Sequence, residues 1–113
     1  MRYMYVSAIS MFLLSFSAAR AQNNDTPIRF INQIDDERII HVYARSPGDR
    51  YWGDDLLEGS IRPGSRRLID VSDGYECRRD VRVITHLGRV ADFERINSCD
   101  IEHITLRERD FWN

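Results

Sequence analysis

The chain has 113 residues, of which 42% are hydrophobic and 30% are charged, with only six Gly and three Pro. Such a composition indicates one globular domain, and it excludes a disordered acidic tail, a collagen and a polytopic membrane protein. The formal net charge of -2 provides no overall basic field, so we expect no binding of nucleic acid or anionic lipid.

The first 21 residues have the features of a secretory signal peptide. Arg2 supplies the positive charge, and residues 6–18 are mostly apolar. Ala19-Arg20-Ala21 forms a small-residue cleavage site, and Ser17-Ala18-Ala19 is a second possible site. The apolar run is shorter than the roughly 20 residues that span a bilayer. A short membrane anchor or a buried helix remains the alternative. We therefore expect export to the periplasm or the extracellular space, without membrane insertion after cleavage. The remaining chain divides into a loose leader, residues 22–27, and a single domain, residues 28–113.

Export also bears on the two cysteines, Cys77 and Cys99. Two cysteines in a short exported chain indicate an intrachain disulfide. A reactive thiol or a metal pair is the alternative, but two cysteines without a CxxC spacing or a histidine cluster make a poor zinc site.

The first half of the domain has the pattern of strands separated by turns. Residues 28–33 alternate in polarity, and residues 39–45 are rich in β-branched and aromatic side chains, so both are predicted strands. A charged turn over 33–38 separates them, and Ser46-Pro47-Gly48-Asp49 is a second turn. Residues 50–59 are irregular, with one helical turn over 54–58 as the alternative. Ile61, a turn over 62–65 and a strand over 67–71 predict a hairpin.

The second half contains the clearest hairpin. From Cys77 to Leu87 apolar and polar side chains alternate, Gly88 turns the chain, and residues 89–99 return. This hairpin brings the two cysteines together. Residues 101–107 are one more predicted strand. The sequence therefore predicts an all-β fold, a small antiparallel β-sandwich, Ig-like or similar, with about six to eight strands and one disulfide.

The irregular segment holds the candidate site: Asp49, Tyr51, Trp52, Asp54 and Asp55. Its aromatic side chains, together with Tyr43, are a candidate platform for a sugar or peptide ligand. The alternative is that Trp52, Leu56 and Leu57 close one end of the sandwich. The three aspartates are a weak calcium candidate, since they match no known calcium-loop spacing. No other metal and no cofactor is expected.

The remaining polar residues do not indicate a catalytic site. The arginines around positions 66–67 and 78–82 are interleaved with acidic residues, which indicates Arg–Asp pairs on a wet sheet face. His41, His86 and His103 have no metal-ligand spacing, and no GxSxG motif is present. A small hydrolase that uses His86 or His103 remains an unfavoured alternative.

The order of short motifs resembles that of a group of small exported proteobacterial proteins of uncharacterised function. The segments that carry the resemblance are Phe30-Ile31-Asn32, Tyr43-Ala44-Arg45-Ser46, Trp52-Gly53-Asp54-Asp55-Leu56-Leu57, Pro63-Gly64, Cys77-Arg78-Arg79-Asp80-Val81-Arg82-Val83, Gly88 and Ile96-Asn97-Ser98-Cys99. The second segment has two residues where the group has one, and Ile96 replaces Val. The resemblance implies an exported β domain and no particular activity. We therefore expect a non-enzymatic binding or interaction module with an unknown protein or small ligand as its partner. The alternative is an inhibitor of a periplasmic enzyme or an envelope-stress factor.

Overall fold

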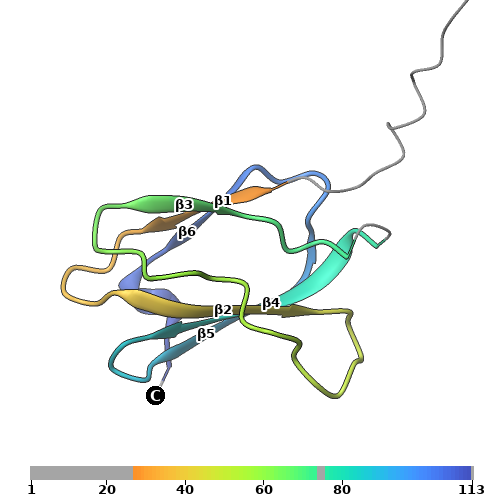
Figure 1. Ribbon diagram of the computed structural model, residues 1–113, viewed down its shortest axis with the longest axis horizontal. Helices are drawn as coiled ribbons and strands as arrows, with labels where there is room; N and C mark the ends of the chain where they lie inside the picture. Colours follow the sequence, from red (N-terminus) through yellow and green to blue (C-terminus); the bar gives the residue numbers. More distant parts are fainter. Residues whose placement is uncertain (1–26, 74–75, 113) are drawn as a thin grey trace, which may run out of the picture.

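The computed structural model describes residues 27–73 and 76–112. Within these residues, six strands form two three-stranded sheets that face each other as the layers of a sandwich (Figure 1). The first sheet has, in order across it, β3 (Arg66–Ile69), β1 (Ile28–Asn32) and β6 (His103–Leu106). The second sheet has β2 (Ile39–Arg45), β4 (Arg78–Thr85) and β5 (Val90–Asn97). The predicted all-β sandwich is confirmed, and its number of strands lies within the predicted range.

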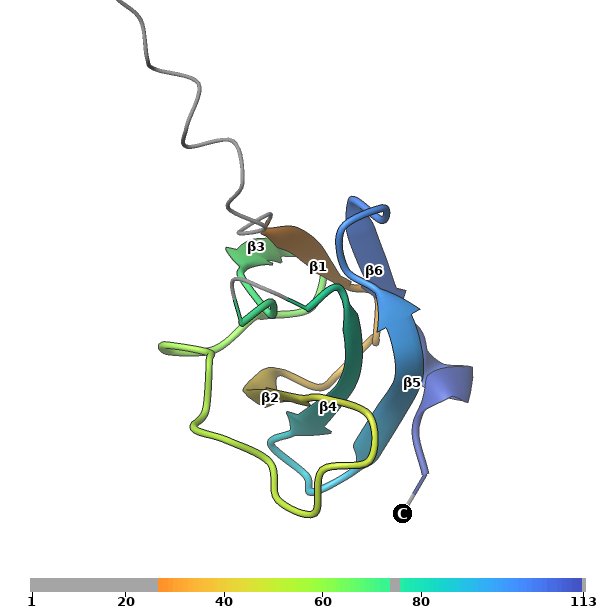
Figure 2. The ribbon, with the colours of Figure 1, turned by 90° about the vertical axis from the view of Figure 1, so that its right-hand side faces the viewer.

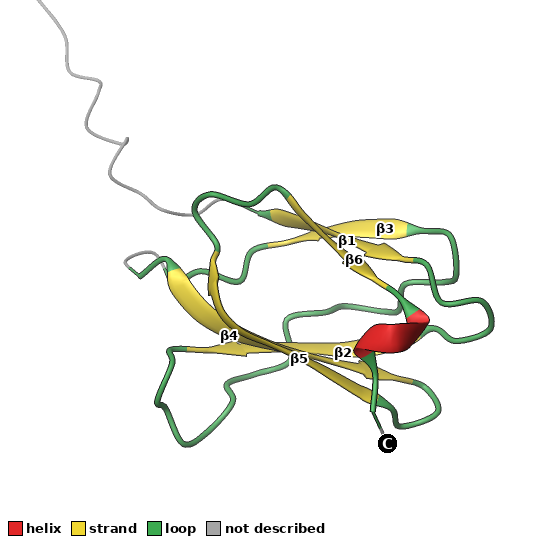
Figure 3. Cartoon of the chain, turned by 180° about the vertical axis from the view of Figure 1, so that it is seen from behind, coloured by secondary structure: helices red, strands yellow, loops and turns green. Residues whose placement is uncertain are grey.

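The last described residues lie next to the second sheet. A short 3-10 helix, η2 (Glu108–Asp110), follows β6 (Figure 3). Beyond it, Trp112 forms an antiparallel bridge with Val90 of β5. Within the described ranges, no helix has the length and apolar character needed to cross a membrane. The predicted signal peptide, and the leader apart from Pro27, lie outside these ranges.

The core forms where the alternating faces of the strands meet between the sheets. Along β1, the side chains of Ile28, Phe30 and Asn32 are buried, as the alternation predicts, and Arg29 and Ile31 alternate onto the outer face. The two layers of strands are seen from the side of the molecule in Figure 2. The buried apolar residues are Ile28, Phe30, Ile34, Ile39, Val42, Ala44, Leu57, Ile61, Ile69, Val71, Val81, Val83, Ala91, Ile104 and Leu106.

The predicted hairpin and the disulfide are both confirmed. β4 pairs with β5 antiparallel, and Gly88 in the connecting turn has φ 88°, a backbone conformation that favours glycine. The turn is closed by the Gly88 N–H, which donates to the Thr85 carbonyl at 2.9 Å. At the other end, the disulfide joins Cys77 and Cys99, whose Cα atoms are 5.3 Å apart. The disulfide therefore ties the two arms of the hairpin together.

The predicted hairpin between Ile61 and residues 67–71 is wrong. Ile61 bridges Ile39 in the second sheet, with backbone hydrogen bonds of 2.9 and 3.0 Å, whereas β3 pairs with β1 in the first sheet. The predicted turn over 62–65 does form, but it carries the chain from one sheet to the other. Buried Asn32 holds this crossing, since its side-chain amide donates to the Ile61 carbonyl at 2.9 Å and its backbone carbonyl accepts from Gly64 at 2.7 Å.

Two further expectations differ from the structure. The predicted last strand forms as β6, but it pairs parallel to β1, so the sandwich is not purely antiparallel. The alternative helical turn over 54–58 does not form, and those residues are irregular. Backbone groups there bond to β2 instead, since the Leu56 N–H donates to the Val42 carbonyl at 2.8 Å.

Candidate functional site

The outer face of the second sheet carries the side chains on which the candidate loop rests. Along β2, Val42 and Ala44 are buried, so His41, Tyr43 and Arg45 alternate onto the opposite, outer face. The rings of His41 and Tyr43 stack, with their centroids 5.8 Å apart. The loop after β2, residues 46–60, runs along the free edge of this strand.

Trp52 lies on two arginine side chains of this outer face and is not part of the buried core. The guanidinium carbon of Arg45 is 4.0 Å from the centroid of the indole ring, and that of Arg82 is 4.9 Å away. Both distances are within the range of a cation–π interaction. Trp52 therefore does not join Leu56 and Leu57 as an end plug, although Leu57 is buried.

Two carboxylates hold these arginines in place. Arg82 forms a two-pronged pair with Asp92 of β5, with both N–O distances 2.8 Å, and the Nε of Arg45 is 3.3 Å from Oδ2 of Asp80. The hydrogen bonds with Asp92 raise the pKa of Arg82, although burial opposes them. The predicted cross-strand Arg–Asp pairing on this face is confirmed for Arg82 and Asp92, and it gives Trp52 a fixed cationic surface.

Asp55 is the second anchor of the loop. One of its oxygens, Oδ1, accepts hydrogen bonds from the backbone N–H of Val42 at 3.1 Å and of Leu57 at 3.0 Å. The other oxygen, Oδ2, is 2.6 Å from Nδ1 of His41. Burial raises the pKa of the Asp55 carboxyl, but the hydrogen bonds from His41 and the two backbone groups outweigh it, so the pKa lies below its ordinary value. The carboxylate therefore ties the loop to β2.

The other candidate residues of the loop face the solvent. Asp49 and Asp54 are exposed, and Tyr51 is 76% exposed. The predicted turn before them is confirmed by a 3.0 Å hydrogen bond from the Asp49 N–H to the Ser46 carbonyl. The five predicted site residues thus divide into two anchors, Trp52 and Asp55, and three exposed side chains. We refer to residues 49–55 as the anchored loop.

The geometry does not gather the three aspartates into a calcium site. Both oxygens of Asp55 are engaged by protein groups, as described above. Among residues 27–73 and 76–112, no group of three or more His, Cys, Asp or Glu side chains is placed to hold a metal ion.

The two histidines of the hydrolase alternative lie in the turn after β4 and at the start of β6. Nδ1 of His86 accepts a hydrogen bond from the Arg38 N–H at 3.1 Å, which gives this ring a structural contact, and His103 is exposed at the start of β6. The His41–Asp55 pair has the geometry of an oriented general base. Within the described part of the chain, however, no hydroxyl or thiol group forms a hydrogen bond with its other ring nitrogen.

The other arginines serve the sandwich itself. Arg79 is buried, where its Nε donates to the Val71 carbonyl and its Nη1 to Oγ of Ser46, both at 2.9 Å. This arginine is not on a wet sheet face, contrary to the prediction for its cluster. Arg67 donates to the carbonyls of Glu58 and Ser60 at 2.6 and 2.9 Å, so it ties β3 to the loop opposite.

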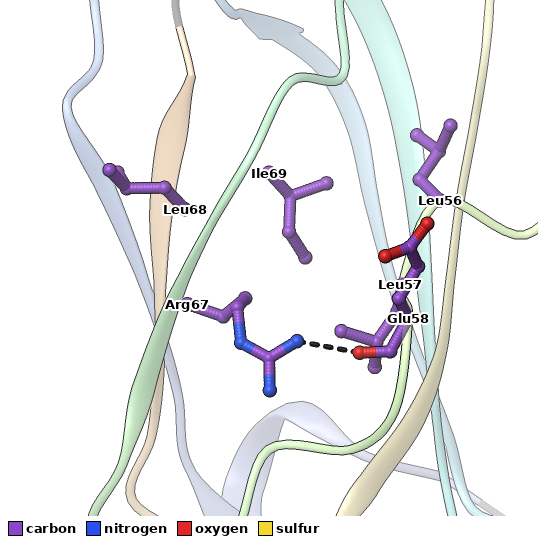
Figure 4. Close-up of a pocket in the computed structure, with 6 residues that line it drawn as sticks. All are labelled: Leu56, Leu57, Glu58, Arg67, Leu68 and Ile69. Carbon is purple, nitrogen blue, oxygen red and sulfur yellow. Dashed lines mark hydrogen bonds between the residues drawn. The ribbon is translucent and has the colours of Figure 1, made fainter.

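A shallow hollow of about 150 Å³ lies between β3 and the end of the loop after β2 (Figure 4). Arg67 and Ile69 line it from β3, and Leu56 and Leu57 face them from the loop. None of the five predicted site residues lines this hollow. It is therefore distinct from the anchored loop.

Comparisons with known proteins do not assign the chain to a family. No protein-family model matches the sequence, no curated protein is significantly similar to it, and no solved structure matches its fold at a significant level.

Proposed function

We propose that the protein is exported and acts as a non-enzymatic binding module, with the anchored loop as its contact surface. The observation that carries this proposal is that Tyr51 is 76% exposed on a loop that is fixed on its C-terminal side by Trp52 and Asp55. A large exposed aromatic side chain on a fixed backbone is favourable for binding, because little conformational freedom is lost when a partner covers it.

The shape of the surface favours a protein partner over a small ligand. Small molecules bind in concave pockets, whereas Tyr51 is exposed on a loop that also carries the exposed residues Asp49 and Asp54. A complementary surface would have an apolar pocket for the tyrosine ring and basic groups at its rim. A second candidate function, inhibition of a periplasmic enzyme, is favoured by the same anchoring, since pre-organised complexes change their interface backbone little on binding.

The contact is testable with a photo-crosslinking amino acid placed at Tyr51 in living cells. Leu87 is the matched control, because it is 65% exposed in the turn between β4 and β5. We expect a defined adduct from position 51 and none from position 87. Equal capture at both positions, or no adduct at position 51, would contradict the proposal.

The role of the anchor is tested by Trp52→Ala. Without the indole ring the loop loses its contacts with Arg45 and Arg82. We expect trypsin to cleave after exposed Arg50 at least about tenfold faster, because cleavage requires local opening of the loop, and we expect the adduct at position 51 to weaken. An unchanged cleavage rate would show that Trp52 does not hold the loop.

Export rests on the signal-peptide pattern of residues 1–21, and the Cys77–Cys99 disulfide supports a compartment that permits oxidation. The intact mass of the protein recovered from outside the cytoplasm tests both features. We expect a chain that begins at Gln22 and is about 2 Da lighter than its reduced form, the two hydrogens lost when the bond forms. A chain retaining Met1, or one with free thiols, would contradict export in this form.

A further inference from the structure

Both edges of the second sheet are covered, whereas the edge strands of the first sheet, β3 and β6, are not bridged by other parts of the described chain. The edge of β2 is covered by Leu56 and Ile61, and that of β5 is bridged by Trp112. β3 ends its sheet, and no backbone hydrogen bond from another part of the described chain reaches its outer edge. An uncovered edge strand is a template for pairing with a further strand.

The hydrogen bonding of β1 shows which groups of β3 face this edge. The N–H groups of Arg29 and Gln33 donate toward β6, so the alternate residues Phe30 and Asn32 face β3. The partners of Ile28 and Phe30 in β3 are Ile69 and Arg67. The backbone groups of Arg66, Leu68 and Asp70 therefore point away from β1, to the free edge.

The same three residues also share the outer face of the sheet. Ile69 is buried and Arg67 points toward the loop opposite, so the alternate side chains of Arg66, Leu68 and Asp70 lie on the solvent side. Leu68 is 56% exposed, and in Figure 4 it lies on the other side of β3 from Ile69. The edge therefore presents a cation, an exposed leucine and an anion at even spacing.

We propose that two copies of the chain associate by antiparallel pairing of their β3 edges about a two-fold axis at Leu68. In this register Leu68 lies opposite its counterpart, and Arg66 of each copy lies opposite Asp70 of the other. Opposite charges directly across an antiparallel pair are stabilising, and like charges are destabilising. A register centred on Arg66 or on Asp70 would instead place like charges opposite each other, so the charge pattern selects the register centred on Leu68.

The side chain of Asp70 is compatible with this arrangement. Its Oδ1 accepts hydrogen bonds from the N–H and the hydroxyl of Ser72, at 3.0 and 2.9 Å, whereas Oδ2 has no partner among the described residues. A single arginine on an edge would only discourage association, but a cation and an anion placed symmetrically about an exposed leucine make the edge complementary to itself.

The contact involves about five residues of each chain and is smaller than a standard stable interface. We therefore expect a reversible dimer with a dissociation constant on the order of 10 µM to 1 mM. The anchored loop lies on the side of the molecule away from β3 in both Figure 1 and Figure 2, so both loops would stay accessible. The dimer does not depend on the proposed function, but it would present two binding loops at once.

The test is a pair of charge reversals, Arg66→Asp and Asp70→Arg, made in the protein recovered from cells that produce the full chain. Sedimentation velocity over a concentration series measures association. We expect the unaltered protein to dimerise, each variant alone to show a dissociation constant raised at least about tenfold, and an equimolar mixture of the two variants to associate again. Only the mixture restores opposite charges at both positions across the axis.

The controls are Arg62→Asp and Asp36→Arg, which make the same charge changes at exposed positions outside β3. They should dimerise as the unaltered protein does. Circular dichroism checks the fold. A second pair of charge reversals, Arg66→Glu and Asp70→Lys, replaces any variant that does not fold. A monomer at millimolar concentration, single variants that associate normally, or a mixture that stays monomeric would each overturn the proposal.

Discussion

Replacing Asn32 with alanine should strongly destabilise the fold. The side chain is completely buried, and its amide nitrogen donates to the carbonyls of Glu37 and Ile61 at 2.8 and 2.9 Å. Its oxygen accepts from the Ile34 N–H at 2.9 Å. One side chain therefore fixes the turn after β1 and the point at which the chain crosses between the sheets.

The expected loss follows from the groups that alanine would leave without partners. Two carbonyls and one N–H would lose their hydrogen bonds, and an unsatisfied buried polar group costs about 1–3 kcal/mol. Since some water can enter the space, we expect Asn32→Ala to lower the free energy of unfolding by about 3–5 kcal/mol, a large part of the roughly 5–15 kcal/mol of a typical domain. Asn32→Asp should be at least as harmful, because it turns a carboxylate oxygen toward the two carbonyls.

Urea denaturation of the oxidised protein, followed by circular dichroism, measures this loss. Gln33→Ala is the matched control, because that side chain is the exposed neighbour in sequence, and we expect a change within about 0.5 kcal/mol. A loss below about 1 kcal/mol for Asn32→Ala would refute the reasoning, since it would mean that the three hydrogen bonds contribute almost nothing beyond what water supplies.

Two further changes test the disulfide and the partly buried ion pair between Arg89 and Glu37. Replacing Cys77 and Cys99 together with serine opens a loop with a sequence separation of 22, and we expect a loss of about 3.4 kcal/mol in the free energy of unfolding, measured by urea denaturation; an unchanged midpoint would contradict this. The hydrogen bond from Arg89 lowers the pKa of the Glu37 carboxyl, and burial opposes this effect. The ionised carboxylate therefore stabilises the fold at pH values above the ordinary pKa of about 4.3. This stabilisation is lost as the pH falls through the lower pKa of the folded state. Glu37→Gln should therefore be less stable than the unaltered protein at pH 7, and the difference in stability should disappear in acid. The control Asp36→Asn, at an exposed position, should be as stable as the unaltered protein at both pH values. Thermal melting from pH 2 to pH 7 measures the difference, and a loss of stability in Glu37→Gln that does not depend on pH would refute the reasoning.

The strands could be predicted from the sequence because most of them are half buried. In β1, β2 and β4, side chains alternate between the core and the outer face, and this period of two is visible in the residues themselves. The turn at Gly88 and the two cysteines at the ends of the hairpin are likewise local signals. Such signals locate a strand and its buried face.

Local signals do not determine which strands are neighbours. The segments on either side of the turn over 62–65 read as a hairpin, yet Ile61 and β3 belong to different sheets. Asn32 helps to determine which sheet each segment joins, since its hydrogen bonds to Glu37 and Ile61 connect positions that are 5 and 29 residues away in the sequence. An asparagine in line with the buried residues Ile28 and Phe30 was the available signal, but its partners could not be predicted from spacing alone.

The candidate loop was located by its composition, but its internal division of roles was not predictable. A tryptophan is usually expected in the core, and Trp52 is outside it because Arg45 and Arg82 come together on the outer face only when β2 pairs with β4. The same holds for His41 and Asp55, which lie 14 residues apart and meet only because the loop follows the edge of β2. Both anchors depend on strand pairing, which explains why the exposed tyrosine could not be distinguished from the anchoring tryptophan beforehand.

The whole loop after β2, residues 46–60, links the proposed binding surface to the proposed dimer. Its backbone and Asp55 cover the edge of β2, so that strand is closed to pairing while Tyr51 is presented on the outside. Arg67 ties the end of the same loop to β3 through its side chain, without using the backbone edge of that strand. The same segment therefore closes the edge of β2 and leaves the edge of β3 open. Loosening the loop at Trp52 should consequently weaken contacts at Tyr51 while the self-association through β3 persists, and concentration-dependent sedimentation of Trp52→Ala would show whether the two surfaces are independent.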